Sequence, residues 1–360
     1  MNKLKISVPL VVKNEERHLK DCLDNLTWVN EVILVDTGST DGTIDIIYKW
    51  CEDNNVNITF PHKGHFTDRG GVVRESKLNI HLFVEPETFL VDFKDKKLFC
   101  FDKARNFALD KCTQDYILIL DADERIYSPE VLENLMTEHS QVDVWYLFQG
   151  SRLSNGKVSP CMSTRFWKNG LGIHYTKMVH ETVDEYVDQK GLKRGKTDLM
   201  IDHLGFVDDK YNAQKSQRVI DAIEYEGHPY KNYYLGVAYA QMQDTEKAID
   251  YLDASVNDEM PFNIKAHALT LSGDVLRQYG EYYFKMAEER LMHSKRICPN
   301  QNLSHIVLAE IKRFKGQNPM RELKKIKRRD YKVSDMHQDL LFTDEQFKQF
   351  ETEFMSQCTK

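Results

Sequence analysis

The feature that most constrains the fold is a short apolar run that ends in acids. Residues 115–124 read DYILILDADE, so four consecutive apolar residues lead directly into the carboxylates of Asp121, Asp123 and Glu124. The run is too short for a helix and is apolar on both faces, as is typical of a central strand in a parallel sheet covered by helices. The sequence therefore predicts an α/β sheet that carries acids at one edge, where open α/β sheets bind ligands.

These acids predict a metal site. Side chains alternate across a strand with a period of two, so Asp121 and Asp123 are expected to point to the same side. Two carboxylates in this position suit Mn²⁺ or Mg²⁺, which take oxygen ligands and often share them with the phosphates of a substrate. The alternative is an acidic turn that follows a strand and binds nothing.

Composition limits the class of protein. The chain has 360 residues, enough for two domains, and its 41% hydrophobic and 29% charged residues are ordinary for a globular protein. The net charge of −7 disfavours nucleic-acid binding over the whole surface. No apolar run approaches the roughly 20 residues that span a bilayer, and Pro9 interrupts the first one, so we expect neither a signal peptide nor a transmembrane segment. The seven cysteines form no C-x-x-C pair, which fits reduced thiols in the cytoplasm.

Strand and helix patterns alternate over the first 150 residues. This alternation predicts a mainly parallel α/β sheet. The expected strands cover residues 6–12, 31–36, 56–60, 116–123 and 142–148, and the expected helices cover residues 19–26, 44–51, 102–112 and 128–136.

About 35 residues, roughly 65–99, separate the third expected strand from the next helix. They include two alternating runs, 79–84 and 88–93, joined by Glu-Pro-Glu, and we expect these runs to form a β-hairpin. Long insertions beside a site often carry specificity. A surface addition without a function is the alternative.

Several nucleotide-binding classes are excluded at the first turn. The loop after residue 12 has no G-x-G-x-x-G, no Walker A lysine and no glycine-rich loop with lysine of the kind found in sugar nucleotidyltransferases. Phosphates would then be held by a metal. Four stretches in order, residues 11–16, 35–43, 103–108 and 120–124, resemble the signatures of glycosyltransferase family 2, which are inverting enzymes with the GT-A fold.

The resemblance implies a donor site for a nucleotide-diphosphate sugar, with a UDP-sugar favoured. The loop that ends at Glu15 and the carboxylate of Asp36 would contact the nucleotide base, Arg105 would lie near the diphosphate, and Asp121 and Asp123 would flank the sugar and the metal. Asp36 that merely ends a strand, and Arg105 on a solvated helix face, are the alternatives. The implied donor-binding residues are Leu10, Val11, Asn14, Glu15, Asp36, Ser39, Arg105, Asp121 and Ala122.

Residues 150–206 show short strands and turns that should cover the acceptor side of the sheet. Val179-His180-Glu181, followed by IDHLGF at 201–206, is similar to the branch of family 2 that includes lipopolysaccharide-core glucosyltransferases and bacteriocin S-glycosyltransferases. This resemblance implies that His203 is a metal or diphosphate contact with Asp123, and that Glu181 is the general base, oriented by His180. Two neighbouring acids, Asp184 and Glu185, are rival candidates for the base.

The rest of the chain is expected to be helical. Residues 235–261 match the tetratricopeptide (TPR) pattern L-G-x-x-Y, A and P, and a looser copy runs through residues 273–299. We therefore expect a GT-A domain at 1–206 and a TPR-like domain at 207–360. Such a domain would serve as a scaffold for a homodimer or for a peptide-like acceptor, or as a buttress for the enzyme.

A basic run, Lys312–Arg329, stands out in this acidic chain. It is either a solvated helix face or a contact for phosphate on nucleic acid or a lipid-linked acceptor. The expected reaction is the inverting, metal-dependent transfer of a sugar to a hydroxyl or thiol. The acceptor is left open between a saccharide or lipid-linked sugar, a peptide side chain and a modified base in phage DNA. The alternative function is a TPR adaptor whose transferase domain is catalytically inactive.

Overall fold

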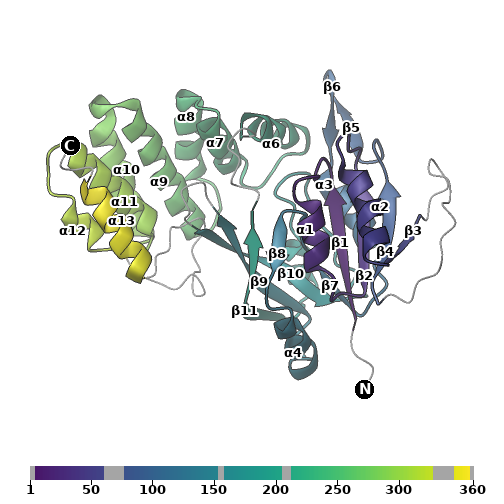
Figure 1. Ribbon diagram of the computed structural model, residues 1–360. Coiled ribbons are helices and arrows are strands. Elements are labelled where there is room, and N and C mark those ends of the chain that lie inside the picture. The colour runs from purple at the N-terminus through teal and green to yellow at the C-terminus, as the bar shows by residue number, and fades with distance from the viewer. Residues whose placement is uncertain (1–4, 61–76, 153–157, 205–211, 327–343, 357–360) are drawn as a thin grey trace. The chain divides into compact units, whose positions relative to one another are not determined.

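The structure is a computed structural model, and it describes residues 5–60, 77–152, 158–204, 212–326 and 344–356 (Figure 1). The chain divides into two compact units. The first comprises Met1–Gly150 and Met162–Gly205, and the second comprises Ser151–Cys161 and Phe206–Lys360. In the described part of the chain, no helix is both long enough and apolar enough to cross a membrane.

The first unit is built on a nine-stranded sheet in the order β3-β4-β2-β1-β7-β10-β9-β11-β8. The five strands from β3 to β7 are parallel, whereas β10 runs antiparallel to β7 and β8 antiparallel to β11. The predicted α/β fold with a mainly parallel sheet is therefore confirmed. The strands are β1 (Ile6–Val12), β2 (Glu31–Asp36), β3 (Asn57–Thr59), β4 (Asn79–Val84), β7 (Tyr116–Leu118), β8 (Glu124–Ile126), β9 (Val144–Arg152), β10 (Val158–Lys168) and β11 (Arg194–His203).

Helices cover both faces of the parallel strands, as their apolar composition requires. On β2, Val32 and Leu34 pack with α1 and α2, while the alternate residues Ile33 and Val35 pack against α3 on the opposite face. Figure 1 shows α1 and α2 together over one face of the sheet. The helices of this unit are α1 (Leu19–Asn25), α2 (Thr43–Asp53), α3 (Phe101–Leu109), α4 (Glu130–Glu138) and α5 (Asp184–Gln189).

The insertion differs from the prediction. The hairpin expected between residues 79–84 and 88–93 is wrong, because β4 lies inside the main sheet, parallel to both β2 and β3. Its Ile80, Leu82 and Phe83 are buried, which suits a strand covered on both faces. The hairpin is instead formed by β5 (Leu90–Phe93) and β6 (Lys96–Phe99). The insertion residues before 77 lie outside the described part of the chain.

The strand expected over 116–123 is shorter than predicted. β7 ends at Leu118, and a turn follows in which the Glu124 amide donates to the Asp121 carbonyl at 3.0 Å. The period-two argument that placed Asp121 and Asp123 on one strand face is therefore wrong. Between β10 and α5 the chain makes one isolated bridge, Thr176 with Thr182, in place of a longer strand.

In its described residues after 211, the second unit is helical. Successive helices pack closely at glycines of the predicted repeat. A Cβ added to Gly236 of α7 would lie 2.6 Å from Leu252 Cγ of α8, which is too close for two carbon atoms. A Cβ added to Gly273 of α9 would lie 2.8 Å from Leu291 Cγ of α10. The assignment of these pairs as TPR repeats stays a prediction. The helices are α6 (Asn212–Glu226), α7 (Lys231–Gln241), α8 (Thr245–Ser255), α9 (Phe262–Tyr279), the 3₁₀ turn η3 (Glu281–Tyr283), α10 (Phe284–Ile297), α11 (Asn302–Phe314), α12 (Met320–Leu323) and α13 (Asp344–Ser356).

Part of the predicted basic run has an internal role. The Glu322 carboxylate is buried and accepts hydrogen bonds from Lys295 at 2.9 Å, His305 at 3.0 Å, Lys312 at 2.9 Å and Lys325 at 3.0 Å. We call this cluster the Glu322 hub. Two cations of the basic run are thus tied to a carboxylate between α10, α11 and α12, while residues 327–329 lie outside the described part of the chain.

Candidate active site

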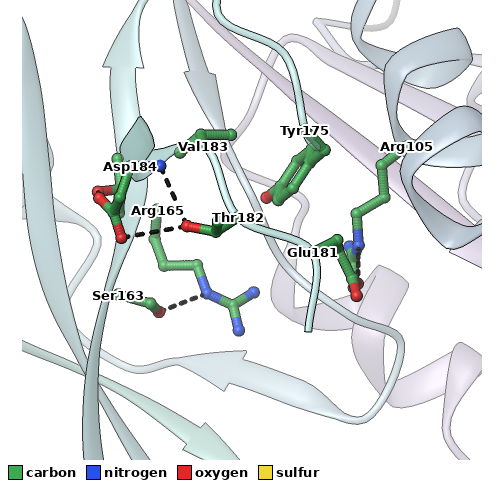
Figure 2. A pocket seen from close by; sticks show the side chains of 9 residues that line it. Arg105, Ser163, Arg165, Tyr175, Glu181, Thr182, Val183 and Asp184 are labelled. Carbon is green, nitrogen blue, oxygen red and sulfur yellow. Dashed lines mark hydrogen bonds and ion pairs between the residues drawn. The ribbon is translucent and has the colours of Figure 1, made fainter. Parts of the chain in front are cut away.

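Arg105 joins three segments that carry predicted site residues. Its guanidinium donates from one terminal nitrogen to Asp121 Oδ1 at 2.8 Å and from Nε to Glu181 Oε1 at 2.8 Å. The guanidinium carbon of Arg105 lies over the Tyr175 ring, 5.5 Å from the ring centroid. Figure 2 shows Arg105 and Glu181 facing each other at the cavity wall. Helix α3, the acidic turn and the Val179–Glu181 segment therefore come together at one point.

Asp121 lies between two cations. Arg105 contacts one carboxylate oxygen at 2.8 Å, and a terminal nitrogen of Arg165 is 4.0 Å from the other. Burial alone would raise the pKa of Asp121, but the charges of Arg105 and Arg165 hold it below its usual value. Asp121 is therefore a carboxylate at neutral pH.

Asp123 pairs with His203 rather than with Asp121. Asp123 Oδ2 is 3.1 Å from His203 Nε2, and the Asp123 carbonyl accepts from the Leu204 amide at 2.9 Å. Burial opposes a charge on His203, but the hydrogen bond and the charge of Asp123 raise the pKa of the imidazole above its usual value. The predicted neighbours Asp123 and His203 are brought together at the end of β11.

The Asp123 and His203 pair fits two ligands of one metal ion. Neighbouring ligands of an octahedral ion with bonds of about 2.1 Å are about 3 Å apart, close to the 3.1 Å between these atoms. Within the described residues, no group of three or more His, Cys, Asp or Glu side chains gathers at a metal-binding spacing.

The predicted donor loop is fixed by its own hydrogen bonds. Asp36 is buried, and its Oδ1 accepts from the amides of Gly38 at 3.0 Å and Ser39 at 3.1 Å. Asn14 has a left-handed backbone with φ 57°, and its backbone N–H donates to Ser39 Oγ at 2.8 Å. The Glu15 amide donates to Thr43 Oγ1 at 2.7 Å. These bonds tie the ends of β1 and β2 into one rim.

Three predicted donor residues have side chains turned into the protein. Leu10 and Ala122 belong to the buried core, and Val11 packs against the cluster on the α3 face. If these residues contact a donor, they do so through the backbone. Their donor-binding role stays a prediction.

A cavity of about 100 Å³ lies next to the Arg105 contacts. Burial raises the pKa of Tyr175 in its wall to about 12, so the phenol keeps its proton at neutral pH. Figure 2 shows how the side chains surround it. Its lining residues are Arg105, Ser163, Thr164, Arg165, Tyr175, Glu181, Thr182, Val183 and Asp184.

The candidate bases differ in their surroundings. Glu181 lines the cavity and is contacted by Arg105, whereas its neighbour His180 is exposed and has φ 52°. Asp184 Oδ1 accepts from the hydroxyls of Tyr146 at 2.9 Å and Thr164 at 2.7 Å. Glu185 is half exposed and pairs with Lys177.

Sequence reasoning missed Arg165 and the buried role of Glu124. Arg165 lies on β10 between Thr164 and Phe166, and its guanidinium contacts the Glu124 carboxylate. The signal in the sequence was an arginine directly before the apolar pair Phe166 and Trp167, because a charged residue at a buried position requires a counter-charge. The acid that terminates the DADE motif is that counter-charge.

The fold is the mainly parallel α/β sheet that the motifs predicted, and it carries an arginine-bound carboxylate and an Asp and His pair at its edge. No family model matches the chain. It is 23% identical over 233 residues to the lipopolysaccharide core biosynthesis glycosyltransferase LpsC of Rhizobium meliloti, covering 61% of this chain and 73% of LpsC.

A second relative is the SPbeta prophage-derived glycosyltransferase SunS of Bacillus subtilis, 25% identical over 305 residues. The match covers 77% of this chain but only 60% of SunS. These relatives confirm the predicted resemblance to glycosyltransferases. Among solved structures, S. aureus TarS 1–349 in complex with UDP-GlcNAc aligns with a TM-score of 0.40 and 14% identity, over 81% of this chain and 91% of that one.

Proposed function

We propose that this chain transfers a sugar from a UDP-sugar to a hydroxyl or thiol acceptor with inversion at the anomeric carbon. The observation that carries the proposal is Arg105, which holds Asp121 of the acidic turn and Glu181 of the acceptor segment within hydrogen-bond distance of one guanidinium. The similarity to LpsC and SunS, both named as glycosyltransferases, supports the same reaction class.

The donor side stabilises a leaving diphosphate. Asp123 and His203 would hold Mn²⁺ or Mg²⁺, which supplies positive charge against the diphosphate when bound. Arg105 adds a second, fixed positive charge at the same edge, and guanidinium groups match phosphate oxygens in geometry. The rim of Asn14, Asp36 and Ser39 would receive the nucleotide.

The acceptor side supplies the base. In an inverting displacement the acceptor attacks from the face opposite to the diphosphate. Its O–H or S–H proton passes to a carboxylate, while the bond from the anomeric carbon to the diphosphate oxygen breaks and UDP leaves. Glu181 lies in the cavity wall and is oriented by Arg105, which makes it the proposed base. The hydroxyls of Thr182 and Tyr175 line the same space and could orient the acceptor.

The test is release of UDP from a panel of UDP-sugars by the full chain, with and without Mn²⁺, in the presence of saccharide and peptide acceptors. Metal-dependent release that rises with one acceptor is the expected result. Calorimetry with UDP and Mn²⁺ accompanies it, because binding does not depend on the right acceptor. If the chain neither binds UDP nor releases it, the adaptor with a catalytically inactive transferase domain is the better function.

A further inference from the structure

Glu124 ends the acidic motif but faces away from solvent. Its side chain is 0% exposed. One carboxylate oxygen, Oε2, accepts from the backbone amide of Asp121 at 2.8 Å, and the other, Oε1, accepts from the Gln149 side chain at 2.6 Å. The third acid of the motif is therefore bonded to the backbone of the first.

Arg165 holds this carboxylate from β10. Its two terminal nitrogens donate to Glu124 Oε2 and Oε1, each at 3.2 Å, and its Nε donates to Ser163 Oγ at 3.0 Å. The Gln149 side-chain oxygen lies 3.3 Å from the same guanidinium. A bidentate pair of this kind fixes direction as well as distance. Figure 2 shows Arg165 extended along the cavity with its Ser163 contact.

The turn itself is held at its carbonyls as well. The Glu124 amide donates back to the Asp121 carbonyl at 3.0 Å, and the guanidinium of Arg125 donates to the carbonyls of Ala122 at 2.8 Å and Glu124 at 2.7 Å. The Asp121 amide depends on a side chain, the Glu124 carboxylate. A change at Glu124 is therefore transmitted to the backbone that carries both Asp121 and Asp123.

We propose that Glu124, held by Arg165 and Gln149, is a positioning residue that sets the Asp121–Asp123 turn for binding a divalent metal together with a nucleoside diphosphate. This inference rests on the proposed function. Glu124 contacts neither the metal nor the nucleotide. It acts through the Asp121 amide, and Arg165 and Gln149 act through Glu124.

The variant that isolates this role is Glu124→Gln. Glutamine keeps the size of the side chain, but its amide nitrogen cannot accept a hydrogen bond. One Arg165 contact is therefore lost in either orientation of the amide, together with the bond from the Asp121 amide or the bond from Gln149. Changes to residues that orient metal ligands typically weaken metal binding or activity about 10- to 100-fold. We therefore expect Mn²⁺·UDP to bind about 10- to 100-fold more weakly by calorimetry. In turnover assays the metal concentration for half-maximal activity should rise, with kcat recovering at saturating Mn²⁺.

A second variant covers the case in which Glu124→Gln does not fold. Gln149→Met removes the 2.6 Å bond to Glu124 Oε1 and the 3.3 Å contact with Arg165, but leaves the Asp121 amide bond in place, and should weaken Mn²⁺·UDP binding in the same direction by a smaller factor. The control is Lys168→Met on β10, the strand of Arg165, which breaks the 3.1 Å ion pair with Asp143 and should leave the binding constant unchanged.

The outcomes separate the two proposals. If the unchanged chain binds Mn²⁺·UDP and a folded Glu124→Gln variant binds it equally well, the positioning role is refuted and the proposed function stands. The same holds if Gln149→Met binds as the unchanged chain does when Glu124→Gln cannot be folded, or if Lys168→Met weakens binding as much as either variant. If the unchanged chain does not bind Mn²⁺·UDP at all, the proposed function fails, and this inference fails with it.

Discussion

Replacement of Glu322 by glutamine should destabilise the helical unit strongly. The carboxylate accepts from Lys295, His305, Lys312 and Lys325 at 2.9 to 3.0 Å, and its own side chain is 6% exposed. Removing one partner of a buried ion pair costs about 3–5 kcal/mol, because the remaining charges stay buried without compensation. Lys325 is 44% exposed and adds little to this figure, since solvent screens exposed pairs.

A loss of this size is measurable by thermal unfolding. For a unit of this length, each kcal/mol shifts Tm by about 2–4 °C, so the Glu322→Gln variant should melt roughly 6–20 °C lower. Circular dichroism at 222 nm is the suitable signal, because all four tryptophans, Trp28, Trp50, Trp145 and Trp167, belong to the first unit. The tryptophan emission then serves as an internal comparison.

A matched control is available on α10. Glu288 pairs with Lys315 at 2.8 Å, with both side chains about 30% exposed, so Glu288→Gln should cost less than about 1 kcal/mol. If Glu322→Gln lowers Tm no more than Glu288→Gln does, the hub contributes nothing beyond ordinary surface pairs and the reasoning is refuted.

The same hub predicts a pH dependence. Hydrogen bonds from His305 and three lysines hold the pKa of Glu322 far below its usual value, despite its burial. A depressed folded-state pKa stabilises the fold fully above the unfolded value of about 4.3, and this stabilisation declines as the pH falls below it. The difference in Tm between the unchanged chain and Glu322→Gln should therefore be constant from pH 6 to 7 and shrink below about pH 4. A difference that grows on acidification would contradict this assignment.

Three further predictions concern the catalytic site and the helix packing. Asp123→Ala should abolish metal-dependent UDP binding while circular dichroism stays unchanged; an unaltered affinity by calorimetry would remove Asp123 from the metal site. Glu181→Gln should lower turnover about 10²- to 10⁴-fold with little change in UDP affinity, and near-normal transfer would move the base to Asp184 or Glu185. Gly236→Ala should cost about 1–3 kcal/mol of stability by overpacking, because the new Cβ would lie 2.6 Å from Leu252 Cγ. A higher Tm would show that the higher helix propensity of alanine outweighs the clash.

Much of the parallel half of the sheet could be predicted from the sequence. Apolar runs such as 31–36 and 116–120 are continuous because helices cover both sheet faces, so their burial is visible in composition alone. The family resemblance implied that Arg105 lies near the diphosphate and Asp121 beside the sugar. The two side chains are 2.8 Å apart, and their roles toward a donor stay predictions. The hairpin of the insertion was misplaced because an alternating pattern gives strand type but not strand partner. β4 pairs with β2, and the paired residues Glu31 and Asn79 are 48 positions apart in the sequence.

The acidic turn shows a second limit of sequence reasoning. The pattern DADE reads as the continuation of a strand, but the chain turns after Leu120, and Glu124 folds back to bond the Asp121 amide. Local propensity does not contain the partner that makes this favourable, which is Arg165 on β10, 41 positions away. The Asp123 and His203 contact across 80 positions depends on the β8 and β11 pairing in the same way.

The placement of β4 has a consequence for how freely the insertion can vary in evolution. β4 pairs in register with β2, with Asn79 opposite Glu31 and Val84 opposite Asp36. A deletion or a one-residue slip would therefore exchange Ile80 and Leu82, which pack with α2, for the residues that face α3. Directly after it, the Glu85 amide donates to the Asp36 carbonyl at 2.7 Å, and Pro86 Cβ lies 3.1 Å from where a side chain on Gly38 would begin. Residues 79–86 are therefore constrained from two sides, by the sheet and by the loop expected to receive the nucleotide. Insertions and deletions should therefore occur in other parts of the insertion. Substitutions near Pro86 should change the nucleotide preference more than they change the stability of the fold.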